Sequence, residues 1–302
     1  MSIKGILITL LAPMENHIAN GGEKLLGNAS SIKRRPDGKV YVSGQMQRHV
    51  IFSAIDRLNQ DDTNKESTYV SNGDGIGNNV ETDLRADMGG FMHPSKGDYS
   101  GRRTAPLSVT PAVALSESEI GRDLMLRLST MDRNNAVATR EFSQEDIMHM
   151  NFFLDINSLG VSKVFSYENN FHINSKYIKH VAETERKRRA KLYIEATRMM
   201  NDYANQARNA VSGEPQQVLI IFDTKMSRKA SRYFVANEIE KNNILAELKE
   251  RGATHFFGDD TEGVTSVAKA YSLALQFLET NTLFDPCEGD ATIQTFAQAF
   301  PE

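Results

Sequence analysis

The chain carries at residues 28–52 the stretch NASSIKRRPDGKVYVSGQMQRHVIF, and this stretch decides how its first half folds. It begins as a polar, basic loop and passes into a β-branched and aromatic segment, Val40–Val42. Ser43 follows at a position typical of a helix N-cap, and apolar residues recur behind it at helical spacing. The sequence therefore predicts a loop, a short strand and a helix that runs from Ser43 to near Leu58–Asn59.

The start of this predicted helix lies next to a group of cations. The free N–H groups and the positive dipole end of a helix attract anions. Ser43 and Gln45 add neutral donors, and Arg48 adds a bidentate cation one turn into the helix. The preceding loop contributes Lys33, Arg34, Arg35 and Lys39. The arrangement favours a phosphate ligand, but an ordinary surface helix behind a solvated basic loop fits the same spacing.

The rest of the chain mixes strand and helix patterns. Runs typical of buried strands are Ile3–Leu11, Pro106–Leu115, Ile147–Ile156 and Val218–Phe222. Amphipathic patterns predict helices over Glu119–Leu128, Glu183–Arg208 and Ser266–Leu278. The segment from Asp61 to Gly101 is rich in glycine and breaks the pattern, and we expect the acidic tail after Thr280 to be weakly structured.

Length and composition indicate a globular chain. The 302 residues allow one or two domains, and no run approaches the ~18 apolar residues of a membrane span. The N-terminus lacks the cationic region and cleavage site of a signal peptide. A single cysteine, Cys287, permits no internal disulfide. We therefore expect a reducing, cytoplasmic setting.

The charge distribution permits a nucleic-acid partner although the net charge is −4. Residues 238–302 contain 12 acidic and 4 basic residues, whereas the preceding 237 contain 27 acidic and 31 basic ones. An electrostatic footprint requires only a local patch, so a net negative chain can still bind a polyanion.

Several motifs resemble one protein family. The order of basic loop, Val40–Val42 and Ser43-x-Gln45-x-x-Arg48 is similar to the start of the Cas-seven family, the backbone subunits of CRISPR Cascade complexes. Arg48 stands where that family usually has lysine. The segment DLRADMGGFM at 83–92, followed by Arg102 and Arg103 before PLSVTP, resembles the DevR branch of type I-B-like systems. The resemblance covers the first half of the chain well and the last 90 residues poorly.

The resemblance implies an α+β fold. It would consist of an RNA-recognition-motif-like (ferredoxin-like) palm made of residues 1–60 and 147–302, with C-terminal helices. A fingers or web insertion would occupy residues 61–128, and a β-hairpin thumb residues 129–146. Val218–Phe222 would be the closing strand of the palm. Within the thumb, Ala138, Thr139, Arg140 and Phe142 resemble the descending arm.

The same resemblance implies a non-catalytic subunit of the RAMP superfamily in antiviral defence. It would oligomerise along the spacer of a crRNA and present the bases for pairing with a target DNA strand. Its partners would be the crRNA, further copies of itself and companion subunits, namely a small RAMP cap subunit, a large subunit and a crRNA-processing subunit. Cofactors, metal ions and catalytic residues are not expected. The RNA-binding residues would be Lys33, Arg34, Arg35, Lys39, Ser43, Gln45, Arg48, Arg102 and Arg103.

Two other functions stay open. Related superfamily members cut RNA with a loop aspartate near the first helix, but Glu15 and Asp37, the acidic residues upstream of Ser43, fit no such pattern. A DNA-binding regulator would require a helix-turn-helix, which the sequence does not show. Asp83, Asp87, His93 and Asp98 invite a metal site but match no ligand spacing. The basic cluster Arg186–Lys191, and Lys225, Arg228, Lys229 and Arg232, are either solvated faces or extensions of a binding surface.

Overall fold

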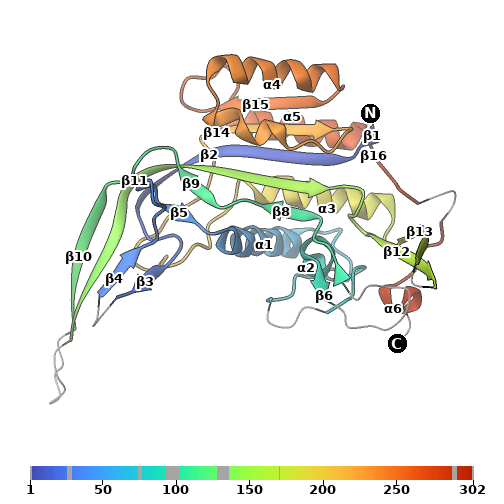
Figure 1. The fold of residues 1–302 in the computed structure, drawn as a ribbon, viewed down its shortest axis with the longest axis horizontal. Coiled ribbons are helices and arrows are strands. Elements are labelled where there is room, and N and C mark those ends of the chain that lie inside the picture. The colour runs from blue at the N-terminus through green and yellow to red at the C-terminus, as the bar shows by residue number, and fades with distance from the viewer. Residues whose placement is uncertain are drawn as a thin grey trace.

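The computed structural model describes residues 2–25, 29–73, 77–92, 102–127, 136–169, 171–287 and 291–300. It shows a mixed α+β fold, as expected, with one ten-stranded sheet in the described part (Figure 1). The main strand order is β15–β14–β2–β11–β4–β3. These strands are β15 (Thr254–Asp259), β14 (Gln217–Asp223), β2 (Gly5–His17), β11 (Ala136–Asp155), β4 (Ala29–Ile32) and β3 (Gly22–Lys24). The predicted strands in β2, β11 and β14 are confirmed, although β14 has β15 as an outer neighbour.

Shorter strands border β11. They are β8 (Leu107–Val109), β9 (Ala112–Ala114) and β10 (Ile120–Arg127), and β9 also pairs with β5 (Tyr41–Val42). The first two lie in the predicted extended segment Pro106–Leu115. Because β5 leads directly into the first helix, this pairing fixes where that helix starts.

The sheet is buried on both faces, which explains why β2 is a nearly continuous apolar run. Alternate side chains of a strand point to opposite faces, so Ile6, Ile8 and Leu10 enter one core and Leu7 the other. The first core lies under α1 (Gly44–Asp61), α3 (Glu183–Ala196) and α5 (Val267–Thr280). The second lies under η1 (Lys229–Val235) and α4 (Glu238–Glu250), seen at the top of Figure 1.

Helix α1 confirms the predicted helix and its cap. The Ser43 hydroxyl accepts a bond from the Met46 N–H at 3.2 Å, and the Ser43 N–H donates to Asn20 Oδ1 at 3.0 Å. Val50, Ile51 and Ile55 are fully buried against the sheet. The N-terminus of α1 is therefore held from both sides.

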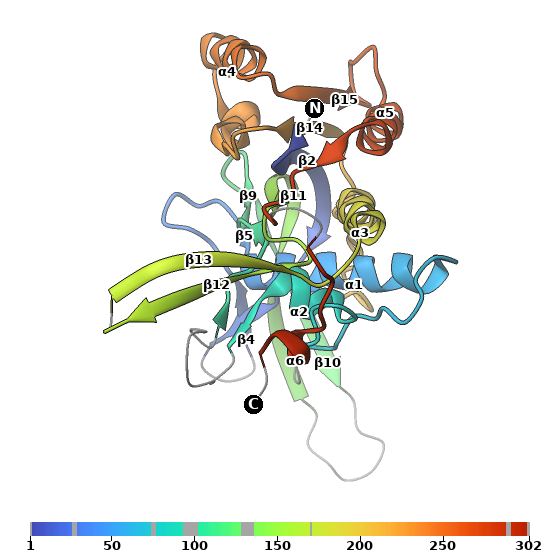
Figure 2. The same cartoon turned by 90° about the vertical axis from the view of Figure 1, so that its right-hand side faces the viewer.

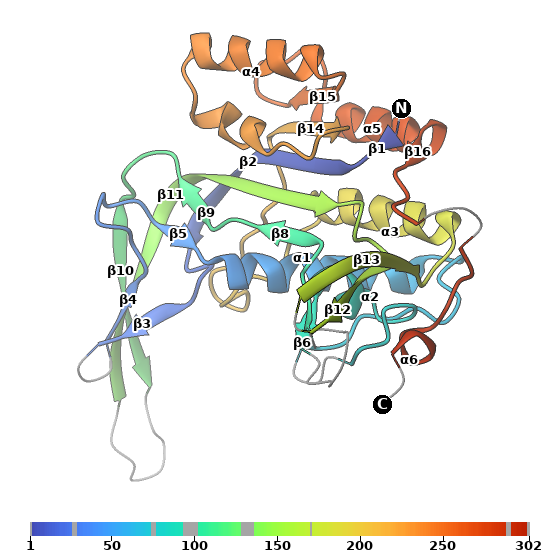
Figure 3. The same ribbon diagram turned by 45° about the vertical axis from the view of Figure 1, so that its right-hand side comes forward.

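The predicted helix Glu119–Leu128 is wrong. This segment is strand β10, which pairs antiparallel with β11 from Ile120↔Ser143 to Arg127↔Ala136. A Cβ on Gly121 would lie 2.3 Å from the Phe142 ring, so the glycine lets that ring cover the strand. The resulting hairpin projects away from the helices (Figure 3) and is joined midway along its length by β4, which pairs with β11 at Thr139 and Arg140.

A second hairpin was not predicted. Strands β12 (Val161–Glu168) and β13 (Phe171–Lys179) pair with each other and with no other described strand. Figure 2 shows this hairpin extending sideways from the body of the molecule. It follows β11 after a short turn at residues 156–160.

The predicted helix over Glu183–Arg208 is too long, because α3 ends at Ala196. Thr197 follows, and its buried hydroxyl donates to the Ile194 carbonyl at 2.7 Å, which favours termination. The chain then turns back, and the Tyr203 hydroxyl donates to Gln47 of α1 at 3.0 Å. The predicted helix Ser266–Leu278 is confirmed as α5, capped by Ser266.

The expectation of a weakly structured tail is wrong for the residues that the structure describes there. Strand β16 (Thr282–Leu283) pairs parallel with β1 (Ser2–Ile3). Beyond it, α6 (Phe296–Ala299) buries Phe296 completely against Phe91 and His180. None of the helices within the described ranges is both long and apolar enough to cross a bilayer.

Candidate nucleic-acid interface

The basic loop leads into the N-terminus of α1 and is partly held by internal contacts. Lys39 Nζ donates to the Leu115 carbonyl at 2.7 Å. Arg34 lies 3.7 Å from Glu141, and Arg35 lies 3.9 Å from Asp37. Both arginine side chains stay widely exposed, at 43% and 51%, so these surface pairs leave their charge available to a ligand.

The remaining loop and cap residues lie along the same entry to α1. Lys33 is half-buried and Gln45 is exposed. Ser43 uses its hydroxyl to cap the helix, so it positions the helix terminus as predicted. The loop folds back on itself at the Arg34–Val40 bridge, and its cations Lys33, Arg34, Arg35 and Lys39 lie on the segment that leads through β5 to Ser43 and Gln45 at the start of α1.

Arg48 has a second arginine as a neighbour that the sequence analysis missed. The Arg48 guanidinium carbon lies 5.7 Å from the centroid of the Phe52 ring, and that of Arg85 lies 4.7 Å from the same centroid. Arg48 also donates to the Gly89 carbonyl. Arg85 belongs to α2 (Leu84–Gly89), whose N-cap is Asp83. Helices far apart in the sequence therefore place two guanidinium groups beside one ring.

The electrostatics of this pair favour an anion. Burial lowers the pKa of Arg48. Burial also lowers the pKa of Arg85, the charge of Arg48 lowers it further, and Asp83 and Asp56 act weakly in the opposite direction. Among the described residues, no carboxylate forms an ion pair with either arginine within 4.0 Å. A phosphate between them would relieve both the repulsion and the burial cost.

Arg103 lies elsewhere and has a structural role. Its guanidinium is buried and bonds to Asp87 at 2.5 Å, and to the carbonyls of Val161 and Ser158 at 2.6 and 2.5 Å. These bonds tie α2 to the root of the β12–β13 hairpin. Arg103 therefore does not join the arginine pair, and the side chain of Arg102 lies outside the described residues.

The expected basic face Arg186–Lys191 is largely internal. Arg189 is fully buried and pairs with Asp87 at 2.6 Å, and Arg186 is fully buried and donates to the Ile156, Leu159 and Phe284 carbonyls. Asp87 accepts both Arg103 and Arg189 and the Gly160 N–H. Lys229 and Arg232 pair with Glu247 and Glu240, at the opposite face of the sheet from α1.

The hairpin residues chosen from the sequence lie on the outer part of β11. Thr139 is exposed, whereas Ala138, Arg140 and Phe142 are half-buried, and Arg140 donates to Asn205. The missed residue here is Glu141, which is 8% exposed. Its carboxylate accepts the Ile32 N–H at 3.3 Å and bonds to Arg122 at 3.2 Å, so it joins the hairpin to the basic loop.

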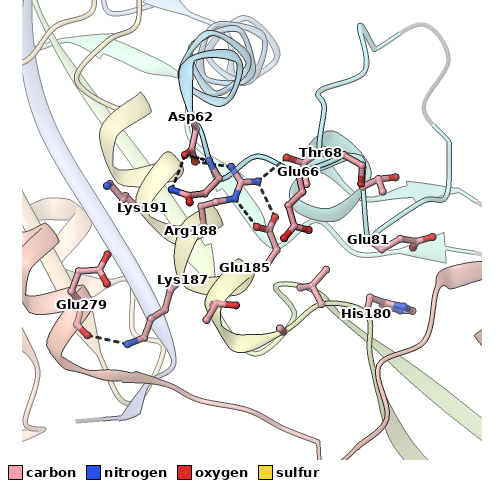
Figure 4. A pocket seen from close by; sticks show the side chains of 16 residues that line it. Asp62, Glu66, Thr68, Glu81, His180, Glu185, Lys187, Arg188, Lys191 and Glu279 are labelled. Atoms are coloured by element: carbon pink, nitrogen blue, oxygen red, sulfur yellow. Dashed lines mark hydrogen bonds and ion pairs between the residues drawn. The ribbon is translucent and has the colours of Figure 1, made fainter.

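A pocket of about 730 Å³ opens between the end of α1 and the start of α3 (Figure 4). Of its cations, Arg188 is neutralised by Glu185 and Asp62 at 2.6 and 3.0 Å, whereas Lys187 donates to the Glu279 carbonyl at 3.0 Å. His180 engages both ring nitrogens, with the Gln294 carbonyl at 2.7 Å and with Ser162 at 2.8 Å. The imidazole of His180 is therefore held in place by internal contacts.

The acidic residues and histidine that were weighed as metal ligands are either used in other contacts or lie outside the described part of the chain. Asp83 caps α2 and Asp87 is neutralised by two arginines, whereas His93 and Asp98 lie outside the described residues. No group of three or more histidine, cysteine, aspartate or glutamate side chains there could hold a metal ion.

The fold defines the class: an α+β protein on a mainly antiparallel sheet that is covered on both faces, with one sheet strand extended into a projecting hairpin. A family model described as "CRISPR-associated negative auto-regulator DevR/Csa2" matches residues 16–211, and the chain belongs to this family. A search of curated proteins finds no match.

Two solved structures share the fold. One is a chain of a "CRISPR RNA-guided surveillance complex", with a TM-score of 0.55 and 14% identity over 91% of this chain and 99% of that chain. The other belongs to a "CRISPR RNA-guided surveillance complex, pre-nicking", with a TM-score of 0.55 and 9% identity over the same shares. At these identities the likeness concerns the fold.

Proposed function

We propose that the chain is a non-catalytic backbone subunit of a Cascade-type CRISPR effector. It would assemble in several copies along the spacer of a crRNA, bind the phosphate backbone and present bases to a target DNA strand, together with small, large and crRNA-processing subunits. Family membership and the fold shared with surveillance-complex chains support a role in such a complex. The observation that carries the RNA contact is the pair Arg48 and Arg85.

The regions expected from the sequence have counterparts in this proposal. The sheet with α1, α3 and α5 would be the palm, and the β10–β11 hairpin the thumb, which then begins at Ile120 rather than at residue 129. Residues between α1 and β10, including α2, would be the fingers. Arg85 would thus bring the fingers into contact with the same strand that the palm binds.

The chemistry of the interface suits a guide of any sequence. Guanidinium and ammonium groups and a helix N-terminus recognise phosphates, which carry no sequence information. Holding the backbone in this way leaves base edges available for pairing and lowers the entropic cost of that pairing. Binding should therefore depend on length and salt more than on sequence.

The test is RNA binding by the double variant Arg48→Ala/Arg85→Ala. We expect affinity for unrelated single-stranded RNAs to fall by the same factor, about tenfold for each charged hydrogen bond that is removed. The control is Arg57→Ala, which removes a cation from the other end of α1, where it pairs with Asp202. Wild-type affinity in the double variant, or an equal loss in the control, would refute this interface.

The same preparation separates the other functions. RNA incubated with the protein and Mg²⁺ or Mn²⁺ should stay intact, whereas an endoribonuclease would shorten it. Duplex DNA should compete poorly for the RNA, whereas it would compete best with a DNA-binding regulator. Either of those results would replace the scaffold proposal.

A further inference from the structure

The β12–β13 hairpin is anchored only at its root. There Val161 and Val164 are buried, Arg103 donates to the Val161 carbonyl, and Lys179 pairs with Asp285 at 2.5 Å. Beyond this root the two strands pair only with each other in the described structure, and Figure 2 shows them extending past the helices. A two-stranded ribbon without a packing partner is marginal on its own, which raises the question of what it contacts.

The outer part of the hairpin exposes large apolar side chains. Phe171 is 75% exposed, Ile173 59% and Tyr177 38%. Apolar groups gathered on a projecting element indicate a contact surface rather than chance exposure. Exposure alone does not identify the partner.

Positive charges next to the hairpin's rings favour a nucleic acid as the partner. Lys163 Nζ lies 5.1 Å from the centroid of Phe165 and 5.8 Å from that of Tyr177. Residues 161–179 contain three lysines against the single acidic residue Glu168. Exposed rings interleaved with ammonium groups match the needs of single-stranded nucleic acid, whose bases stack on aromatic faces while cations bind its phosphates.

We propose that this hairpin is a second nucleic-acid contact, in which Phe165, Phe171 and Tyr177 stack on unpaired bases and Lys163 and Lys176 bind the adjoining phosphates. The ligand is a single-stranded polynucleotide. The proposal rests on the proposed function only in naming its source, a guide RNA or a target DNA strand. The hairpin root and Arg85 are both fixed to α2, because Asp87 accepts the Gly160 N–H at 2.9 Å. The helix that carries Arg85 therefore also anchors the hairpin.

The absence of tryptophan from the sequence permits a direct test. In Phe171→Trp, or in Tyr177→Trp as a second probe, the only indole reports on stacking. Titration with oligoadenylate and with oligodeoxyadenylate should quench its fluorescence. Quenching by RNA alone assigns the surface to a guide, by DNA alone to a target strand, and by both to either strand.

Affinity provides the second measurement. Lys163→Ala/Tyr177→Ala should weaken binding of the quenching strand by about tenfold or more. The control Ile239→Ser removes an exposed apolar side chain from α4, 74% exposed, and should bind as the wild type does. Thermal unfolding of each variant verifies that it folds.

Two results would overturn the proposal. One is an unquenched indole in a protein that binds RNA normally. The other is unchanged affinity with a smaller oligomer, which would make the hairpin a contact between copies of the chain. A failure of the proposed function gives a different result. In that case Arg48→Ala/Arg85→Ala would bind RNA with unchanged affinity, whether or not the indole fluorescence is quenched.

Discussion

Arg48 and Arg85 lie against one phenyl ring, with guanidinium carbons 5.7 and 4.7 Å from the Phe52 centroid. Their approach is unfavourable without a counter-ion, since each charge is half-buried and like charges repel. Such an arrangement is typical of a functional site, where local stability is exchanged for affinity.

The loop cations should contribute to binding through charge alone. Replacing Lys33, Arg34, Arg35 and Arg48 with alanine should reduce the log–log salt slope by about 0.7 for each phosphate group that the variant no longer binds. The measurement is RNA affinity at several salt concentrations. The matched control replaces Lys229, Arg232, Lys241 and Lys249, four cations around α4, and should leave the slope unchanged; the reverse outcome would place the phosphate track on α4.

The buried carboxylate of Asp87 should be essential for folding. Asp87→Asn leaves Arg103 and Arg189 buried without their counter-charge and should destabilise by about 3–5 kcal/mol in denaturant unfolding. The control Asp62→Asn removes a more exposed partner of Arg188 and should cost about 1 kcal/mol. Equal losses of unfolding free energy in the two variants would mean that the ion pairs of Asp87 contribute no more to stability than a surface ion pair does.

The same residue should contribute to acid sensitivity. Burial alone would raise the pKa of Asp87, but the Arg189 and Arg103 guanidiniums hold it below its ordinary value. A carboxyl group with a depressed folded pKa stabilises above its unfolded pKa and loses that contribution as the pH falls below about 4.

The carboxylate of Glu141 should hold the hairpin and the basic loop together. Glu141→Ala removes the acceptor of the Ile32 N–H and the partner of Arg122, and should cost about 1–3 kcal/mol. Denaturant unfolding measures the loss, and Glu145→Ala, exposed on the same strand, is the control. If both variants unfold alike, the loop is held by strand pairing alone.

His149 should make the protein less stable in mild acid. Burial lowers its pKa to about 4, against a smaller opposing effect of a bond to the Ser231 backbone. The unfolded histidine binds a proton near pH 6.5, so stability is lost as the pH falls from there towards 4, by about 2 kcal/mol between pH 7 and pH 5.

His149→Gln should remove most of that loss in urea unfolding at the two pH values, and His49→Gln, exposed on α1, should not. If the stability of His149→Gln depends on pH as strongly as that of the wild type, other groups cause the loss. His180 and His255 are the candidates, because burial lowers the pKa of each.

Local signals in the sequence predicted α1 well. The Ser43 cap and the apolar spacing behind it are properties of neighbouring residues, and the structure confirms both. Arg85 escaped notice because its proximity to Arg48 depends on how α2 packs on α1, which no local pattern records. The burial of Arg103 and Arg189 depends in the same way on their ion pairs with Asp87, which is distant from both in the sequence.

The wrong helix at Glu119–Leu128 shows the limit of periodicity. Its apolar spacing fits a helix, but pairing with β11 and the cover of Gly121 by Phe142 outweigh it. The β12–β13 hairpin was missed although apolar and polar residues alternate in the sequence, from Phe165 to Glu168 and from Phe171 to Asn174.

Strand β11 spans 20 residues from Ala136 to Asp155, about 65 Å at the usual rise of an extended chain. One end lies in the projecting hairpin, and the other carries Met148, Met150 and Phe152 in the core. The projecting hairpin and the core are therefore joined by one unbroken strand. Because of this continuity, we expect a molecule that binds the hairpin and bends it to distort the core sheet as well.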